Sequence, residues 1–198
     1  MTAQNTDSRN RERLGFAEAV RHYIAPVLTA RCFTCSEATP YVVKFTSPTV
    51  VLALSHAPVS YEIQVTLARK AAPSQLYTLR DILDLALGPE HKDQGFFQAS
   101  ERGRVFECVR AIGDILSKYG ETVLPGEPAV YERMDETARH RNEAYTKQVV
   151  QGPIRKAAEK AWQEHDYAKV RDLYDSIEPD LTPVERKRLE YAKSHSCT

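Results

Sequence analysis

The amino-acid sequence predicts an α+β protein with an N-terminal helix, a three-stranded antiparallel meander and a mostly helical C-terminal half. Three observations lead to this prediction. Apolar residues recur at helical spacing near the N-terminus, alternate with polar residues between positions 41 and 67, and return to helical spacing after position 78. Helical spacing indicates a helix with one buried face, whereas alternation over a short run indicates a half-buried strand.

The first helix follows a polar segment. Residues 1–10 are polar and have no apolar period, so we expect a disordered tail there. The helix itself is expected from an apolar stripe made of Phe16, Val20, Tyr23, Ile24 and Val27. Pro26 falls within this stripe, and it should kink the helix or end it near Ala25 because proline has no backbone N–H.

The meander is expected from three alternating runs separated by short breaks at residues 47–48 and 56–58. The apolar positions of the runs are Tyr41, Val43 and Phe45, then Val50, Leu52 and Leu54, then Tyr61, Ile63, Val65 and Leu67. In the third run these positions are opposed by Glu62, Gln64 and Thr66. One face of the sheet should therefore pack on helices, while the other faces solvent or a partner.

Two helices are expected after the meander. Thr78 and Asp81 have the spacing of a capping box, and Gly88 stands where a helix would end. Residues 88–99 are expected to form a loop. Ser100 can cap the next helix, which should end at Gly120.

That second helix carries the strongest apolar stripe in the chain. Its middle contains Ile112 and Leu116, which we expect to be buried against Tyr61, Ile63 and Val65 of the third strand. It should therefore be a central element of the core.

The segment 124–128 is rich in Pro and Gly, and we place a domain boundary there. Residues 11–126 would form an α+β domain and residues 127–198 a helical extension. The extension should begin with a charged helix that ends at Gly152-Pro153 and continue as a helical hairpin whose second helix is capped by Asp166. Thr182 and Glu185 have capping-box spacing at the start of a last helix.

Charge and hydropathy exclude some classes of partner. The chain has 27 Lys plus Arg, 27 Asp plus Glu and a formal net charge of +0, so it lacks the excess positive charge expected of a nucleic-acid binder or of a protein that binds anionic membranes. No apolar run reaches the ~18 residues that a membrane span needs, and the N-terminus lacks the apolar segment of a secretory signal. We therefore expect a cytoplasmic protein.

The motif Cys32-x-x-Cys35 suggests metal or redox chemistry, but a structural zinc site needs four ligands and no second pair is present. We favour two semi-buried small residues in a connecting turn. The histidines show no ligand spacing, and the sequence contains no nucleophile elbow, phosphate-binding loop or dinucleotide motif. The sequence therefore indicates no catalytic residue, no metal ligand and no cofactor.

The C-terminal hairpin resembles one tetratricopeptide repeat. The resemblance is carried by AEKAW at residues 158–162, HDYAKV at 165–170, LY at 173–174 and the following Pro179. His165 stands where the repeat usually has Gly, and Val170 where it has Ala. Such repeats bind peptides when several are stacked, and this chain has one. The resemblance implies either a peptide-binding surface or a hairpin that packs back on the body of the protein.

A second resemblance covers residues 12–125. The segments VVKFTSPTVVLALSHAPVSYEIQVTL and YTLRDILDLALG are similar to small uncharacterised bacterial proteins of an immunity-like type. Such proteins combine an N-terminal helix, a β-hairpin, a further strand and helices after it. The resemblance implies this fold, and it implies a partner such as a toxin or the subunit of a complex.

These observations favour a non-catalytic protein-binding module, such as a bacterial immunity or accessory protein. A small enzyme or ligand-sensing domain with a pocket between sheet and helices is the alternative, and a homo-oligomer is a third possibility. The expected partner-binding residues are Arg139, Arg141, Trp162 and Tyr174, because aromatic and Arg side chains are favoured anchors in interfaces. Two alternatives remain open: the charged run around Arg139 and Arg141 as a solvated helix face, and Trp162 as a residue buried within its hairpin.

Overall fold

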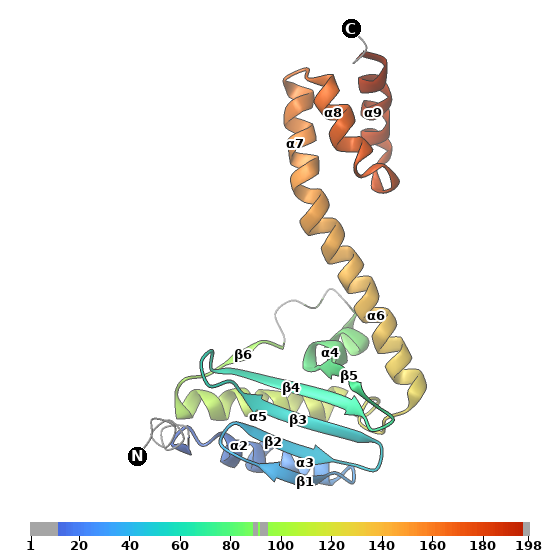
Figure 1. Ribbon diagram of the computed structural model, residues 1–198. Coiled ribbons are helices and arrows are strands. Elements are labelled where there is room, and N and C mark those ends of the chain that lie inside the picture. The colour runs from blue at the N-terminus through green and yellow to red at the C-terminus, as the bar shows by residue number, and fades with distance from the viewer. Residues whose placement is uncertain (1–11, 89–90, 92–94, 196–198) are drawn as a thin grey trace. The chain divides into compact units, whose positions relative to one another are not determined.

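A computed structural model describes residues 12–88, 91 and 95–195, and it shows an α+β fold with one antiparallel sheet (Figure 1). The chain divides into two compact units, Met1–Ala138 and Arg139–Thr198. We call them the sheet unit and the helical unit and describe each by itself. The expected disordered tail at residues 1–10 lies outside the described residues. Within the described residues, no helix is both long and apolar enough to cross a membrane.

The described part of the sheet unit begins with helices, continues with consecutive strands and ends with helices interrupted by one short strand. Its elements are α2 (Phe16–Tyr23), α3 (Ala25–Thr29), β1 (Thr34–Ala38), β2 (Val42–Thr46), β3 (Val50–His56), β4 (Glu62–Arg69), β5 (Ala72–Thr78), α4 (Leu79–Leu87), β6 (Phe97–Gln98), α5 (Arg102–Tyr119) and the first part of α6 (Pro128–Thr146). The break between α2 and α3 falls at Ile24, where Pro26 predicted it.

The sheet has six strands, with the antiparallel order β1-β2-β3-β4-β5 and with β6 paired to β4. Strands β2, β3 and β4 occupy the three alternating runs of the sequence. The pairs Phe45↔Leu52 and Leu52↔Leu67 bring buried residues side by side across them. Strands β1, β5 and β6 were not predicted, because β1 and β5 are mostly exposed and β6 has only two residues.

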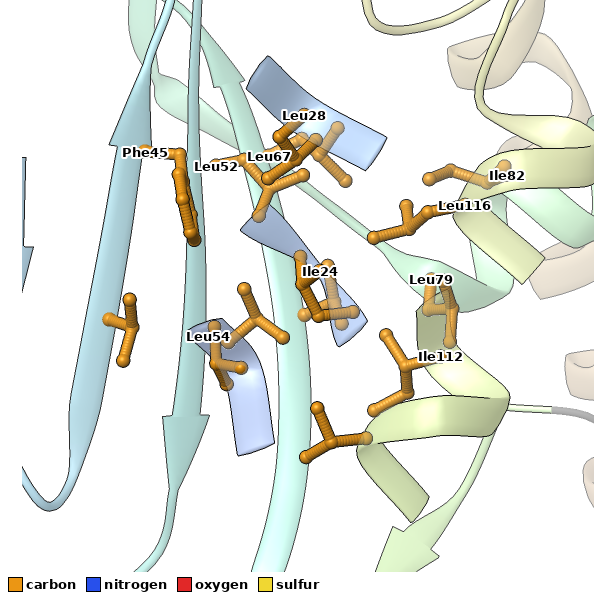
Figure 2. Packing of buried hydrophobic residues seen from close by; sticks show 14 of the residues in the cluster. Ile24, Leu28, Phe45, Leu52, Leu54, Leu67, Leu79, Ile82, Ile112 and Leu116 are labelled. Atoms are coloured by element: carbon orange, nitrogen blue, oxygen red, sulfur yellow. The ribbon is translucent and has the colours of Figure 1, made fainter. Parts of the chain in front are cut away.

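The core of the sheet unit lies between one face of the sheet and helices α2, α3, α4 and α5. In Figure 2, Leu52 and Leu67 of the sheet point toward Leu28, while Ile112 and Leu116 of α5 lie nearby. Both α5 residues are fully buried, as predicted. Ile63 and Val65 of β4 share this face. Tyr61 precedes β4 with a positive φ of 57° and is half-buried, so its place in the predicted stripe was wrong.

The helix ends follow capping chemistry. Thr78 and Asp81 form the predicted capping box at the start of α4, where the backbone N–H of Thr78 donates to Asp81 Oδ2 over 2.7 Å. Gly88 follows the last residue of α4. Helix α5 ends at Gly120 as predicted, but its N-cap is Glu101 and not Ser100.

The sheet unit extends past the predicted boundary at Gly126. Val130, Tyr131 and Met134 of α6 are buried in its core. The hydroxyl of Tyr131 donates to the carbonyl oxygen of Val123 over 3.2 Å, and the ring lies 4.9 Å from that of Tyr77. Partial or full burial raises the pKa of both tyrosines to about 12. The first turns of α6 therefore belong to the sheet unit.

The helical unit contains the end of α6, η1 (Lys147–Gln151), α7 (Gly152–Gln163), α8 (Tyr167–Asp175), η2 (Glu178–Asp180) and α9 (Pro183–His195). A helix begins at Gly152-Pro153 as predicted, but the chain does not leave helical conformation there, because a π-helical turn joins α6 to α7 with no non-helical residue between them. Pro153 is tolerated at the second position of α7. Asp166 caps α8 as predicted, and its carboxylate accepts from the backbone N–H of Lys169 over 3.1 Å.

Helices α7, α8 and α9 share a second core. Its buried residues are Ala158, Ala161, Val170, Tyr174, Ile177, Leu181, Leu189 and Ala192. Small alanines on α7 and α9 let the helices approach closely. At the start of α9 the predicted capping box is present, with the N–H of Thr182 donating to Glu185 Oε2 over 2.7 Å.

Candidate functional site

Aromatic side chains from all three helices of the helical unit meet at one place on its surface. They are Trp162 near the end of α7, His165 in the turn, Tyr167 at the start of α8, and Tyr191 and His195 on α9. We call these five residues the aromatic surface. It contains the single Trp of the chain.

A tight turn brings the α7 and α8 residues together. His165 adopts a positive φ of 57°, which reverses the chain after α7, and Asp166 then caps α8. Trp162 therefore ends one helix while Tyr167 begins the next, and their ring centroids lie 5.6 Å apart. His165 Nδ1 lies 3.0 Å from the hydroxyl of Tyr167. The turn thus fixes the relative orientation of Trp162 and Tyr167.

Helix α9 supplies the other side of the aromatic surface. Tyr191 and His195 stand one turn apart and stack with ring centroids 3.9 Å apart and planes inclined by 13°. Tyr191 also meets Trp162 and Tyr167 edge to face, at 5.4 Å and 5.3 Å. These are favourable aromatic geometries, and each pair adds about 0.5–1.5 kcal/mol beyond the area that it buries.

The aromatic surface is partly open to solvent. Tyr191 is 43% exposed, Trp162 and Tyr167 are half-buried, and the two histidines are exposed. Arg188, one turn before Tyr191 on α9, places its guanidinium 5.2 Å from the ring centre of Trp162 and forms an ion pair with Glu159. Aromatic and guanidinium groups thus lie together at the edge of a fixed helical core.

The arrangement of the rings is set by their mutual packing. The three larger rings pack edge to face against one another, with centroids 5.3–5.6 Å apart. Partial burial raises the pKa of Tyr167, and the neighbouring Tyr191 raises it further, so this hydroxyl stays protonated at neutral pH. A rigid aromatic patch next to an Arg has the composition of an interface anchor.

The four predicted partner-binding residues do not share one environment. Trp162 belongs to the aromatic surface, whereas Tyr174 is 1% exposed and lies in the core of the helical unit. The prediction for Tyr174 therefore needs correction, since its ring stabilises the helices and does not reach the surface. Arg139 and Arg141 lie on the last part of α6, the first exposed and the second half-buried.

Sequence reasoning missed Tyr167, Tyr191, His165 and His195. Tyr191 is hydrophobic like Leu189 and Ala192 of the same helix, but only Leu189 and Ala192 are buried. The available signal was the spacing on α9. Val184, Arg188, Tyr191 and His195 follow at helical intervals and so share one face, which differs from the face of Leu189.

A second cluster of polar groups lies in the sheet unit around Asp84, whose side chain is 1% exposed. Arg80 Nε donates to Asp84 Oδ1 over 2.9 Å, and His91 Nε2 lies 2.6 Å from the same oxygen. A His–carboxylate pair also occurs in catalytic triads. Within the described part of the chain, His91 Nδ1 is buried and has no hydrogen-bond partner.

The cysteine pair of the sequence is exposed. Cys32 adopts a positive φ of 62° before β1, and Cys35 lies on β1. Cys108 is buried in α5, where burial raises the pKa of its thiol. Among the described residues, no three His, Cys, Asp or Glu side chains gather into a group that could hold a metal ion.

Comparison with known proteins gives no relative: no family model matches the chain, and neither a curated protein nor a solved structure is significantly similar to it.

Proposed function

We propose that this protein is a non-catalytic, cytoplasmic protein-binding module whose aromatic surface contacts a partner protein. The observation that carries the proposal is the convergence of Trp162, Tyr167 and Tyr191 from three helices at a partly exposed site. Large aromatic side chains lose little conformational entropy on binding, and here their orientations are already set by mutual packing.

The resemblances support the same class of function. A hairpin like one tetratricopeptide repeat, followed by a further helix, fits a role in peptide or protein recognition. The immunity-like pattern of residues 12–125 favours a partner such as a toxin or a complex subunit. The alternative, an enzyme or ligand-sensing domain, would use a pocket between sheet and helices. That space contains the buried side chains of the core, among them Ile24, Leu54 and Ile112 (Figure 2).

The proposal can be tested by photo-crosslinking in the native host. A benzoylphenylalanine at position 191 should form a discrete protein adduct, because Tyr191 lies at the centre of the aromatic surface. The matched control is the same group at Glu190, which is exposed on another face of α9. An adduct with a second copy of this chain would identify a homo-oligomer. Equal adducts from both positions, or none, would contradict the proposal.

Once the partner is identified, its affinity can be measured from the fluorescence of Trp162. Tyr191→Ala should weaken binding by about tenfold or more, the range of interface anchors, while Glu190→Ala should leave it within about twofold. Unchanged affinity for Tyr191→Ala would place the interface elsewhere. Circular dichroism of both variants would check that the helices are retained.

A further inference from the structure

One charged side chain of the helical unit joins its core to the aromatic surface. Arg188 of α9 forms an ion pair with Glu159 of α7, and its guanidinium lies over the ring of Trp162, 5.2 Å from the ring centre. A hydrogen bond with Glu159 raises the pKa of Arg188, burial opposes the rise, and a hydrogen bond with Tyr174 adds to it. A guanidinium can only donate hydrogen bonds, so the hydroxyl oxygen of Tyr174 accepts. Arg188 therefore contacts a surface ring, a carboxylate and a core hydroxyl.

The charge of Arg188 is used within the helical unit. Its side chain is 26% exposed, and Tyr174, one of its two oxygen partners, is buried in the core. The other partner, Glu159, lies one turn before Trp162 on the same helix. Arg188 is thus held at two points while its charged centre lies over the indole. Any effect of this residue on a bound protein should therefore pass through Trp162.

The remaining ring contacts of Trp162 are made with two tyrosines. The centroids of Tyr167 and Tyr191 lie 5.6 Å and 5.4 Å from that of Trp162, and both rings meet it edge to face. The guanidinium of Arg188 adds a contact over the ring itself. Precise binding sites need side chains whose orientation is set by surrounding packed and hydrogen-bonded groups. Arg188 has both properties that such a group requires, since it is bonded to the core and packed on the ring.

We propose that Arg188 is a positioning residue of the aromatic surface, which holds the indole of Trp162 in the orientation that a partner protein contacts. This inference rests on the proposed function, because the orientation matters for binding only if Trp162 lies in the interface. Glu159 and Tyr174 act one step further back by fixing the guanidinium. Lysine is a poor replacement at this position, since its ammonium group is a compact, strongly hydrated charge without the guanidinium plane.

The first experiment needs no partner. Trp162 is the single Trp of the chain, so the tryptophan bands in near-ultraviolet circular dichroism and acrylamide quenching report its surroundings in the full-length protein. Arg188→Lys keeps the positive charge, and we expect it to cause a partial loss of the tryptophan bands and a larger quenching constant. The control Arg186→Lys makes the same change at an exposed position on another face of α9, and it should leave both signals unchanged.

A second variant keeps this test independent of one substitution. Arg188→Met removes both the charge and the guanidinium plane, and it should change the tryptophan signals at least as much as Arg188→Lys does. Far-ultraviolet circular dichroism without denaturant checks that the helices of each variant are retained. Native tryptophan signals in both Arg188 variants would overturn the proposal, and so would an equal change in Arg186→Lys.

The second experiment measures affinity by titration calorimetry, with the protein identified by crosslinking at position 191. Arg188→Lys should weaken binding about two- to fivefold, which corresponds to the loss of one cation–π contact, and Arg186→Lys should change it by less than about twofold. In a Trp162→Ala protein, Arg188→Lys should have no further effect, because a residue that acts only through Trp162 loses its influence when that ring is absent.

The results separate the positioning role from the proposed function. A further loss of affinity in the Trp162→Ala protein would overturn the positioning role, because Arg188 would then contact the partner directly. If Trp162→Ala by itself leaves the affinity unchanged, the aromatic surface is not the interface and the proposed function fails. If only the positioning role fails, Trp162→Ala still weakens binding, while Arg188→Lys changes neither the tryptophan signals nor the affinity.

Discussion

Two glycines of α5 should respond to alanine substitution with opposite signs. Alanine stabilises a helix interior by up to about 1 kcal/mol relative to glycine, so both changes gain helix propensity. A Cβ atom at Gly103 would have no heavy atom within 4 Å. A Cβ atom at Gly113 would lie 2.9 Å from the carbonyl oxygen of Tyr23 and 3.4 Å from Ile24 Cδ1. Gly113 therefore permits the close packing of α2 on α5.

The size of the Gly113→Ala effect depends on which atoms must move to make room for the added Cβ. The carbonyl of Tyr23 is backbone at the end of α2, and it cannot turn aside as a flexible side chain would. Overpacking of a filled core costs about 1–3 kcal/mol, which exceeds the gain in helix propensity. We expect Gly113→Ala to lower the free energy of unfolding by about 1–2 kcal/mol. Gly103→Ala, in the first turn of α5, should raise it by less than about 1 kcal/mol.

The assay is urea unfolding followed by circular dichroism and by fluorescence. The single Trp of the chain is Trp162 in the helical unit, so its fluorescence reports that unit by itself. The shift caused by Gly113→Ala should appear in the dichroism transition and not in the fluorescence transition. A stabilised Gly113→Ala variant would refute the packing argument, because propensity would then outweigh the contact with Tyr23.

Three further predictions concern the cores and ionisable groups. Ile112→Ala should destabilise the sheet unit by about 2–5 kcal/mol in the same assay, and a change below about 0.5 kcal/mol would contradict its burial. In a folded Cys197→Ser variant, Cys32 and Cys35 should react with a disulfide reagent. Cys108 should react only on unfolding, since it is buried and burial raises the pKa of its thiol. Burial raises the pKa of Glu185, but hydrogen bonds from the N-cap and a nearby guanidinium outweigh it, so the pKa lies below the ordinary 4.5. The Glu185 carboxylate therefore stabilises the helical unit fully above pH 4.5, and this stabilisation is lost as pH falls through the lowered pKa. Glu185→Gln should reduce the acid sensitivity of the fluorescence transition. An unchanged pH profile would argue against this linkage.

The strands and helices that could be predicted are those whose burial alternates along the chain. In β3 every second residue is buried from Val50 to His56, and the larger apolar residues Leu52 and Leu54 fall at buried positions between the smaller Ala53 and Ser55. Strands β1 and β5 have no such contrast, because most of their residues are exposed and Tyr77 of β5 is the one buried residue described in them. They are held mainly by backbone hydrogen bonds to β2 and β4, which leave no apolar period in the sequence.

The candidate site could be predicted only in part, for a related reason. An apolar stripe shows which side of a helix is buried, but it does not show which hydrophobic residues at the margin of that side remain exposed. Leu189 and Tyr191 of α9 are both hydrophobic, yet the first is 3% exposed and the second 43%. The ring contacts of Tyr191 come from Trp162 on α7 and Tyr167 on α8, which are distant from it in the sequence. Local spacing carries no information about such contacts.

The domain boundary shows the same limitation in its sharpest form. Segment 124–128 has the Pro and Gly content of a linker, yet Leu124 is buried and Gly126 lies against Thr49 and Val50. The turns of α6 that follow this segment contribute further apolar side chains, Tyr131 among them, to the core of the sheet unit. Pro and Gly content indicates where the chain turns, whereas the end of a domain is set by the last side chain that is buried in its core. On that criterion the sheet unit continues well into α6, and a chain cut at residue 126 would lose part of its own core.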